Sequence, residues 1–183
     1  MYPLWVRVAG GSHAQTMSSG VEMDYGVDDL VVVPGCGVGR IEAIEKMAVE
    51  DEEVELYRID LGDGNGRMWV PTHLVGAQGV RPVMSSERAE QTWQVIKDQE
   101  APEKRQNWNR RQRRYNEKLM SNEPLEMAEL LGELAAVRAQ KELSFGERKI
   151  FERVRELLIS EIAAALGEPR PKVEERMTAT LAA

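Results

Sequence analysis

The chain has 183 residues, of which 42% are hydrophobic and 30% charged, a composition typical of a globular protein with one ordinary domain or two small ones. It contains no run of about 18 apolar residues, so we expect a cytoplasmic protein that has no membrane-spanning helix and does not associate with a membrane. The net charge of −7 argues against a protein that binds DNA by charge alone. A single cysteine excludes an internal disulfide, and two distant histidines lack zinc-site spacing, so we expect no metal or cofactor.

The first half of the chain is predicted to be rich in β-strands. Residues 1–26 show little periodicity and are interpreted as a flexible leader. Residues 30–33 form a β-branched run, and residues 53–61 alternate apolar and polar side chains, as a half-buried strand does. Glycines in 62–66 predict a turn into a strand over 67–71, whose final proline lacks an N–H and marks a strand end or an edge. We expect four or five short strands in a small open barrel with at least one free edge.

The second half is predicted to be helical. Ser86 is expected to cap a first helix, Pro124 suits the first turn of a later helix, and residues 144–147 have the Ser-x-x-Glu pattern of a capping box. A stripe of apolar residues follows that box at helical spacing: Ile150, Val154, Leu157, Leu158, Ile162 and Leu166.

Strands followed by helices predict an α+β fold, a small Tudor/SH3-like barrel followed by a compact all-α domain. The expected division is a β module over 27–84, a helical module over 85–168, and a tail or short helix over 169–183.

No pattern in the sequence indicates catalysis. The glycine cluster at 34–39 matches neither the dinucleotide fingerprint nor the phosphate-loop pattern, and is better explained as a turn between strands. Acidic residues are scattered, and no nucleophile with a nearby base is suggested by spacing. We therefore do not expect an enzyme.

The most informative segment is 107–115, where an aromatic residue lies among arginines. Residues 100–120 carry seven basic and three acidic side chains, so this segment has a charge of +4 on an otherwise acidic chain. Arginines can hold phosphates while the ring of Trp108 stacks on, or wedges beside, a strained base step. The alternative is equally supported by composition: Trp108 would be a core residue, and the arginines a solvated helix face paired with glutamates.

Trp69 raises a similar choice, since it lies two residues before Pro71 in the predicted edge strand. It is either a core residue, which is favoured when the strand is taken alone, or part of a docking surface for a strand of another chain.

Several motifs, in the same order along the chain, resemble the CarD/CdnL family of RNA polymerase-binding regulators. These are Val33–Gly39 with Ile41–Glu45, Val70-Pro71, Val80–Pro82, Asn107–Arg111, Leu143–Lys149 and Glu156–Glu161. The resemblance spans about residues 28–168. Two departures are that Gln112 stands where the family commonly has tyrosine, and that the turn over 62–66 is longer than usual.

The resemblance implies that the β module docks on the β subunit of RNA polymerase by strand pairing. The matching positions are Arg67, Trp69 and Pro71 on the docking strand and Tyr57 on its partner strand. It also implies that the helical module contacts promoter DNA at the upstream edge of the melted bubble. There Trp108 would wedge into the minor groove, with the backbone held by Arg110, Arg111, Arg114 and Lys118.

The function predicted on this basis is a transcription regulator that stabilises the promoter open complex, as a monomer carried to the nucleoid by polymerase. The alternative is a protein–protein adaptor of the transcription machinery that does not contact DNA.

Overall fold

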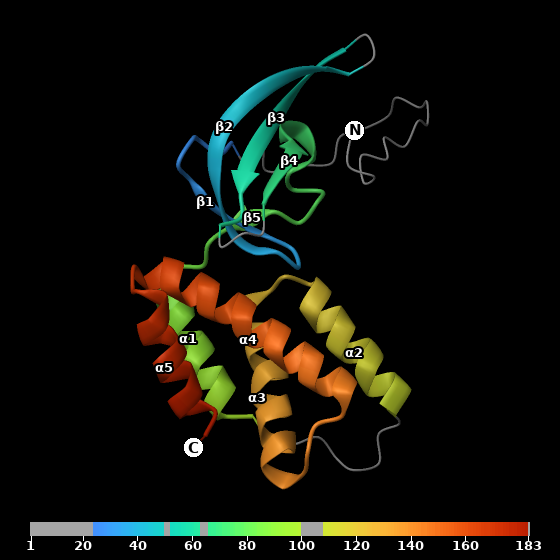
Figure 1. The fold of residues 1–183 in the computed structure, drawn as a ribbon, viewed down its shortest axis with the longest axis vertical. Coiled ribbons are helices and arrows are strands. Elements are labelled where there is room, and N and C mark those ends of the chain that lie inside the picture. The colour runs from blue at the N-terminus through green and yellow to red at the C-terminus, as the bar shows by residue number, and fades with distance from the viewer. Residues whose placement is uncertain (1–23, 50–51, 63–65, 100–107, 183) are drawn as a thin grey trace.

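The computed structural model describes residues 24–49, 52–62, 66–99 and 108–182, and it places a sheet module above a helical module (Figure 1). The strands are β1 Leu30–Val33, β2 Gly37–Val49, β3 Glu52–Asp60, β4 Arg67–Pro71 and β5 Arg81–Pro82, with a short 3-10 helix, η1, at Thr72–Leu74. The helices are α1 Ser86–Lys97, α2 Trp108–Met120, α3 Pro124–Gln140, α4 Phe145–Leu166 and α5 Arg170–Thr180. The expected α+β fold is confirmed.

The five strands form one antiparallel sheet in the order β4-β3-β2-β1-β5. β4 and β5 lie at opposite edges, so among the described strands the sheet is open, with β4 free on one side. The edge position of the strand that ends in Pro71 is thus confirmed. β2, the longest strand, forms with β3 a long hairpin that extends away from the helices (Figure 1).

The core of the sheet module comes from one face of these strands. Ile59 and Tyr57 of β3 face inward together with Val70 of β4 and Ile41 of β2. Gly39 lets β2 approach β3 closely, because a β-carbon there would lie 2.5 Å from Cγ2 of Ile59. The glycine cluster is therefore structural, a turn whose Gly35 and Gly37 have positive φ, as the sequence indicated.

The helical module is built around α3 and α4. The predicted stripe of α4 is confirmed, with Val154, Leu158 and Ile162 fully buried. Its capping box also forms: the Ser144 hydroxyl accepts from the Glu147 N–H, and the Ser144 N–H donates to the Glu147 carboxylate. The cap of α1 is Ser85 rather than the expected Ser86, because the Ser85 hydroxyl accepts from the N–H of Arg88.

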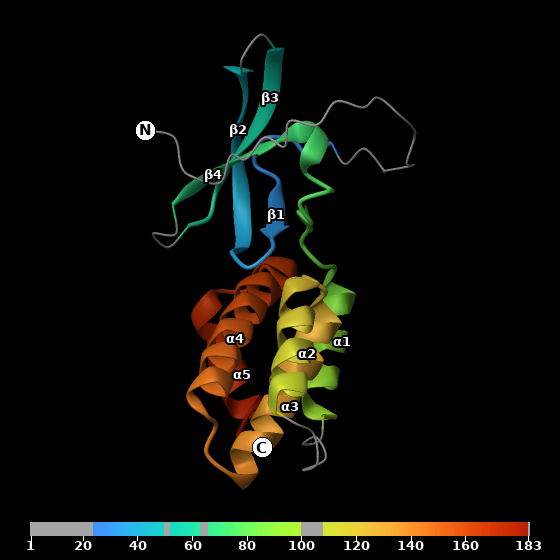
Figure 2. The same cartoon turned by 90° about the vertical axis from the view of Figure 1, so that its right-hand side faces the viewer.

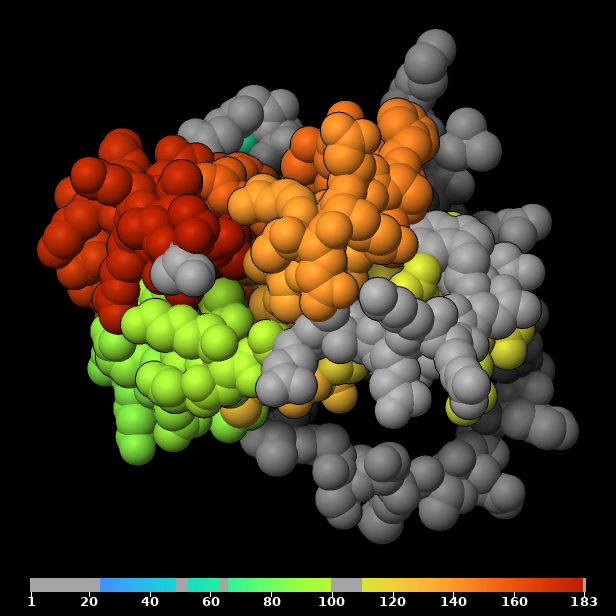
Figure 3. Space-filling view, turned by 90° about the horizontal axis from the view of Figure 1, so that it is seen from below, coloured from blue at the N-terminus to red at the C-terminus, as the bar shows by residue number. Residues whose placement is uncertain are grey.

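The segment 169–183, expected to be a tail or a short helix, contains the helix α5, which packs into the core of the helical module. Its Val173 and Met177 are completely buried, and Arg176 lies over the ring of Trp93 in α1. Figure 3, a view from below, shows α5 and α1, red and green, next to each other. In the described part of the chain no helix is both long and apolar enough to cross a membrane.

Candidate functional site

The free edge of the sheet presents the predicted docking residues on its outer face. Met68 and Val70 of β4 pack on the core, so the alternating residues Arg67, Trp69 and Pro71 face the other way. Of the two interpretations of Trp69, the structure supports the surface one, because its side chain lies outside the core cluster and is only partly buried.

A polar network holds these outer side chains in place. The Trp69 indole N–H donates to Glu45 across 3.1 Å, and Arg67 donates to both carboxylate oxygens of Glu42. Arg58, directly opposite Trp69 on β3, pairs with both glutamates. The hydrogen bond from Arg67 lowers the pKa of Glu42 below its usual value. The network keeps the indole and the guanidinium ordered at the edge.

Tyr57 occupies a different place from the other three predicted docking residues. Its side chain is 2% exposed and lies in the core on the inner face of the sheet. Its hydroxyl accepts the Tyr25 backbone N–H, and the two rings make an edge-to-face contact. The expectation that its side chain joins the docking surface does not fit this structure, because Tyr57 pairs with the inward-facing Val70.

The predicted DNA-contacting residues all belong to α2, which lies along one side of the helical module (Figure 1). Trp108 is its first residue, and the Trp108 side chain lies outside the part of the chain that the structure describes. Whether that indole is exposed therefore stays a prediction. Arg110 is exposed.

The three other predicted cations point towards acidic groups of neighbouring helices. Arg114 pairs with Glu133 of α3, Lys118 with Glu129 of α3 across 2.6 Å, and Arg111 with Glu147 of α4 across 3.6 Å. The alternative in which arginines pair with glutamates is thus realised for these residues, although across helices rather than along one. Their part in holding DNA stays a prediction.

Tyr115 anchors α2 to the core. Its ring is completely buried, and its hydroxyl donates to Glu133. Burial, together with that carboxylate, raises the pKa of the Tyr115 phenol. The phenol therefore stays protonated and remains a hydrogen-bond donor.

Two exposed residues near this helix were not singled out as sites from the sequence. Arg113 is exposed one turn after Arg110, and among the described residues neither arginine forms an ion pair. Their spacing of three residues, which puts both arginines on one face of a helix, was the signal in the sequence that could have identified them. Phe145, at the start of α4, is 74% exposed with the Lys149 ammonium over its ring, and no sequence pattern distinguished it from core aromatics.

The described residues contain no cluster of three or more histidine, cysteine, aspartate or glutamate side chains that could hold a metal ion. One open groove on the surface is lined by Gln112, Arg113, Asn116, Glu117 and Met120, along the outer face of α2. The two candidate contact surfaces are therefore the β4 edge and the outer face of α2.

Comparison with known proteins assigns both modules. Residues 25–84 match the model of the CarD-like/TRCF RID domain, and residues 91–178 match that of the CarD C-terminal domain. The chain belongs to the CarD family.

A relative agrees with this assignment. The chain is 27% identical over 143 residues to a Bacillus subtilis (strain 168) protein named "Putative transcription factor YdeB", over 78% of this chain and 93% of that one. The family assignment makes the chain a CarD-like transcription factor. The β4 edge lies in its RID domain, and α2 lies in its CarD C-terminal domain.

Proposed function

We propose that this CarD-family protein binds the β subunit of RNA polymerase through β4 and stabilises the promoter open complex through α2. The observation that carries the proposal is the free β4 edge with Arg67, Trp69 and Pro71 on its outer face, within a domain of the CarD-like/TRCF RID type. The protein acts by binding alone, as a monomer and without catalysis.

Strand pairing suits this edge physically. One side of β4 pairs with β3, which leaves the backbone groups on its other side available to a strand of a partner. Main-chain hydrogen bonds then supply affinity, and the side chains beside them supply specificity. Trp69 and Arg67 are already ordered by their glutamate partners, so little side-chain entropy is lost on binding.

The DNA half of the proposal uses the N-terminal end and outer face of α2. Arg110 and Arg113 are exposed there and fit phosphate contacts, and Trp108 begins the same helix. A ring that fills a groove distorted only in the open state shifts the population towards that state. Stacking of one aromatic contributes about 1–3 kcal/mol, which would raise the equilibrium constant for promoter opening by about 5- to 150-fold.

The second candidate is an adaptor that does not contact DNA. It is favoured by the internal ion pairs of Arg111, Arg114 and Lys118, which use cations of α2 to hold the helical module together. In that case β4 would still dock on polymerase, and α2 would serve only the fold.

The variant Trp108→Ala separates the two candidates. The proposed function predicts a folded protein that is retained by polymerase but no longer increases promoter melting, and Trp108→Phe should retain part of the effect. If Trp108→Ala melts promoters as the parent does, or fails to fold, the adaptor replaces the wedge.

The docking half is tested by capture of the polymerase β subunit. Trp69→Ala should reduce capture strongly, because it removes the ordered ring beside the free edge. Phe145→Ala, which removes an exposed ring from the other module, is the matched control and should leave capture unchanged. Equal capture by all three proteins would contradict docking through β4.

A further inference from the structure

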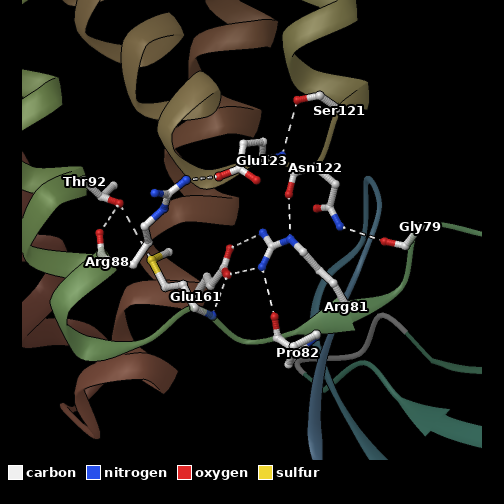
Figure 4. A network of polar contacts seen from close by, with 10 residues as sticks. Gly79, Arg81, Pro82, Arg88, Thr92, Ser121, Asn122, Glu123 and Glu161 are labelled. Atoms are coloured by element: carbon white, nitrogen blue, oxygen red, sulfur yellow. Dashed lines mark hydrogen bonds and ion pairs between the residues drawn. The ribbon is translucent and has the colours of Figure 1, made fainter. Parts of the chain in front are cut away.

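An ion pair with a buried carboxylate joins the two modules where the chain passes from one to the other. Arg81 lies in β5, which pairs with β1 of the sheet, and Glu161 lies in α4. Two guanidinium nitrogens of Arg81 bind the two carboxylate oxygens of Glu161 at 2.5 and 2.9 Å (Figure 4). The Glu161 side chain is 1% exposed and that of Arg81 21%, so the carboxylate is shielded from water while the guanidinium is partly open to it.

The same pair gathers further segments around it. Arg81 Nε donates to the carbonyl oxygen of Asn122, in the turn between α2 and α3, and the Asn122 side chain donates to the carbonyl oxygen of Gly79. The Met84 N–H donates to Glu161 across 3.1 Å. Hydrogen bonds therefore run in both directions between the sheet module and the helical module. Asn122, which accepts one and donates the other, has a positive φ of 56°.

A second contact lies at the β1–β2 turn. Arg153 of α4 donates to the carbonyl oxygen of Gly35, and a β-carbon at Gly37 would lie 3.3 Å from the Leu157 side chain. With contacts at both the linker and this turn, α4 is fixed to the sheet at two places. The two modules are stacked end to end in both views (Figures 1 and 2).

A buried ion pair contributes little net stability, because desolvation offsets its attraction, but its geometry is demanding. We propose that Arg81 and Glu161 are positioning residues that hold the sheet and helical modules in one relative orientation. They thereby fix α2 at a set distance from the β4 edge. The consequence for promoter opening rests on the proposed function, whereas the fixed orientation itself does not.

The expected effect on opening follows from populations. A protein docked through β4 stabilises melted DNA only in molecules whose α2 has the productive orientation. If the contact between the modules loosens until only about a tenth of the molecules hold the productive orientation, the apparent affinity for the open complex falls about tenfold. Binding to polymerase alone should not change.

The relative orientation of the modules is measured by the distance between two spin labels in the full chain. The labels are attached to cysteines introduced by Glu55→Cys in the hairpin and Asn116→Cys on α2, two exposed positions. Cys36 is first replaced by serine so that only these positions are labelled. The parent should give one narrow distance distribution. Arg81→Met and Glu161→Gln should broaden it, and Asn122→Gly, which keeps the positive φ but loses the bond to Gly79, should broaden it less.

Arg88→Met is the matched control. Arg88 pairs with Glu123 close to the joint, but both residues belong to the helical module, so the distribution should stay narrow. Arg81→Met also leaves a buried carboxylate unpaired, so if it unfolds, Glu161→Gln and Asn122→Gly decide the question. Narrow distributions in folded Glu161→Gln and Asn122→Gly, equal to that of the parent, overturn the proposal.

Promoter melting by the same variants tests whether the fixed orientation of the modules affects promoter opening. Broadened distances with normal polymerase capture and weaker melting support both. If the parent itself fails to bind polymerase, the proposed function fails. The distance measurement still decides whether Arg81 and Glu161 hold the modules in one orientation. Unchanged melting with broadened distances overturns the link between orientation and opening.

Discussion

The Tyr115 hydroxyl donates to the buried carboxylate of Glu133 across 2.8 Å, and this hydrogen bond joins α2 to α3. Arg114, the preceding residue, pairs with the same carboxylate. Tyr115 is completely buried, whereas the apolar Leu119 is only partly so and Met120 is 62% exposed. Polar contacts thus add to the burial of the Tyr115 ring in attaching the helix that we propose meets DNA.

Removing this hydroxyl should weaken the helical module. Tyr115→Phe keeps the ring in the core but leaves the Glu133 carboxylate without one of its donors, so we expect a loss of about 1–3 kcal/mol in the free energy of unfolding. Urea titration followed by circular dichroism measures it. Gln112→Ala, exposed on the same helix, is the control, and equal stabilities of the two variants would show that the bond is not needed.

The capping box at the start of α4 should be visible in stability. Ser144→Ala removes the hydroxyl that accepts from the Glu147 N–H, and we expect a loss of about 1 kcal/mol. Thermal unfolding of the parent and the variant tests this. A melting temperature equal to that of the parent would contradict a stabilising cap.

The other half of the box predicts a pH dependence. Burial acts to raise the pKa of Glu147, but the hydrogen bonds from Ser144 outweigh it, and the net pKa lies below the usual value of 4.5. The ionised carboxylate therefore stabilises the fold above about pH 4.5, and this contribution is lost as the pH falls through the lowered pKa. Glu147→Gln should be less stable than the parent at neutral pH, with a difference that shrinks in acid. A difference independent of pH would refute the assignment.

The approach of β2 to β3 predicts a steric effect at Gly39. A β-carbon there would lie 2.5 Å from Ile59 and 3.1 Å from the carbonyl oxygen of Asp60, so Gly39→Ala should cost about 1–3 kcal/mol of stability. Gly76→Ala is the control, because that position is open and its φ is not positive. Chemical denaturation of both variants gives the comparison, and a Gly39→Ala protein as stable as Gly76→Ala would show that the sheet can open there without cost.

The cations of α2 should divide into two groups. Arg110 and Arg113 are exposed and free to contact phosphates. Replacing either with alanine should make the plot of log affinity for promoter DNA against log salt concentration less steep by about 0.9, the change expected for one lost phosphate contact. Arg114→Ala should lower stability instead, because it removes the Glu133 pair. Salt titrations of polymerase–promoter complexes with the parent and each variant measure the slope. Equal slopes for the parent and all variants would show that Arg110 and Arg113 do not contact the DNA.

Most of the architecture was predictable from local patterns. Alternation over residues 53–61 and the proline at 71 predicted β3 and an edge strand, and the spacing from Ile150 to Leu166 predicted α4 with its cap. These features depend on periods of two and 3.6 residues and on caps only three residues apart, so no distant contact is needed to specify them. The motifs that resembled the CarD family were likewise local.

The sequence by itself determined the order of strands and helices, the position of the edge strand and the cationic segment. Only the tertiary structure decided that Tyr57 faces the core, that Arg111, Arg114 and Lys118 face carboxylates, and that Arg81 meets Glu161 eighty residues away. The reason is physical: a side chain's partner depends on which elements pack together. Contacts between residues far apart in sequence are absent from any short window of the chain.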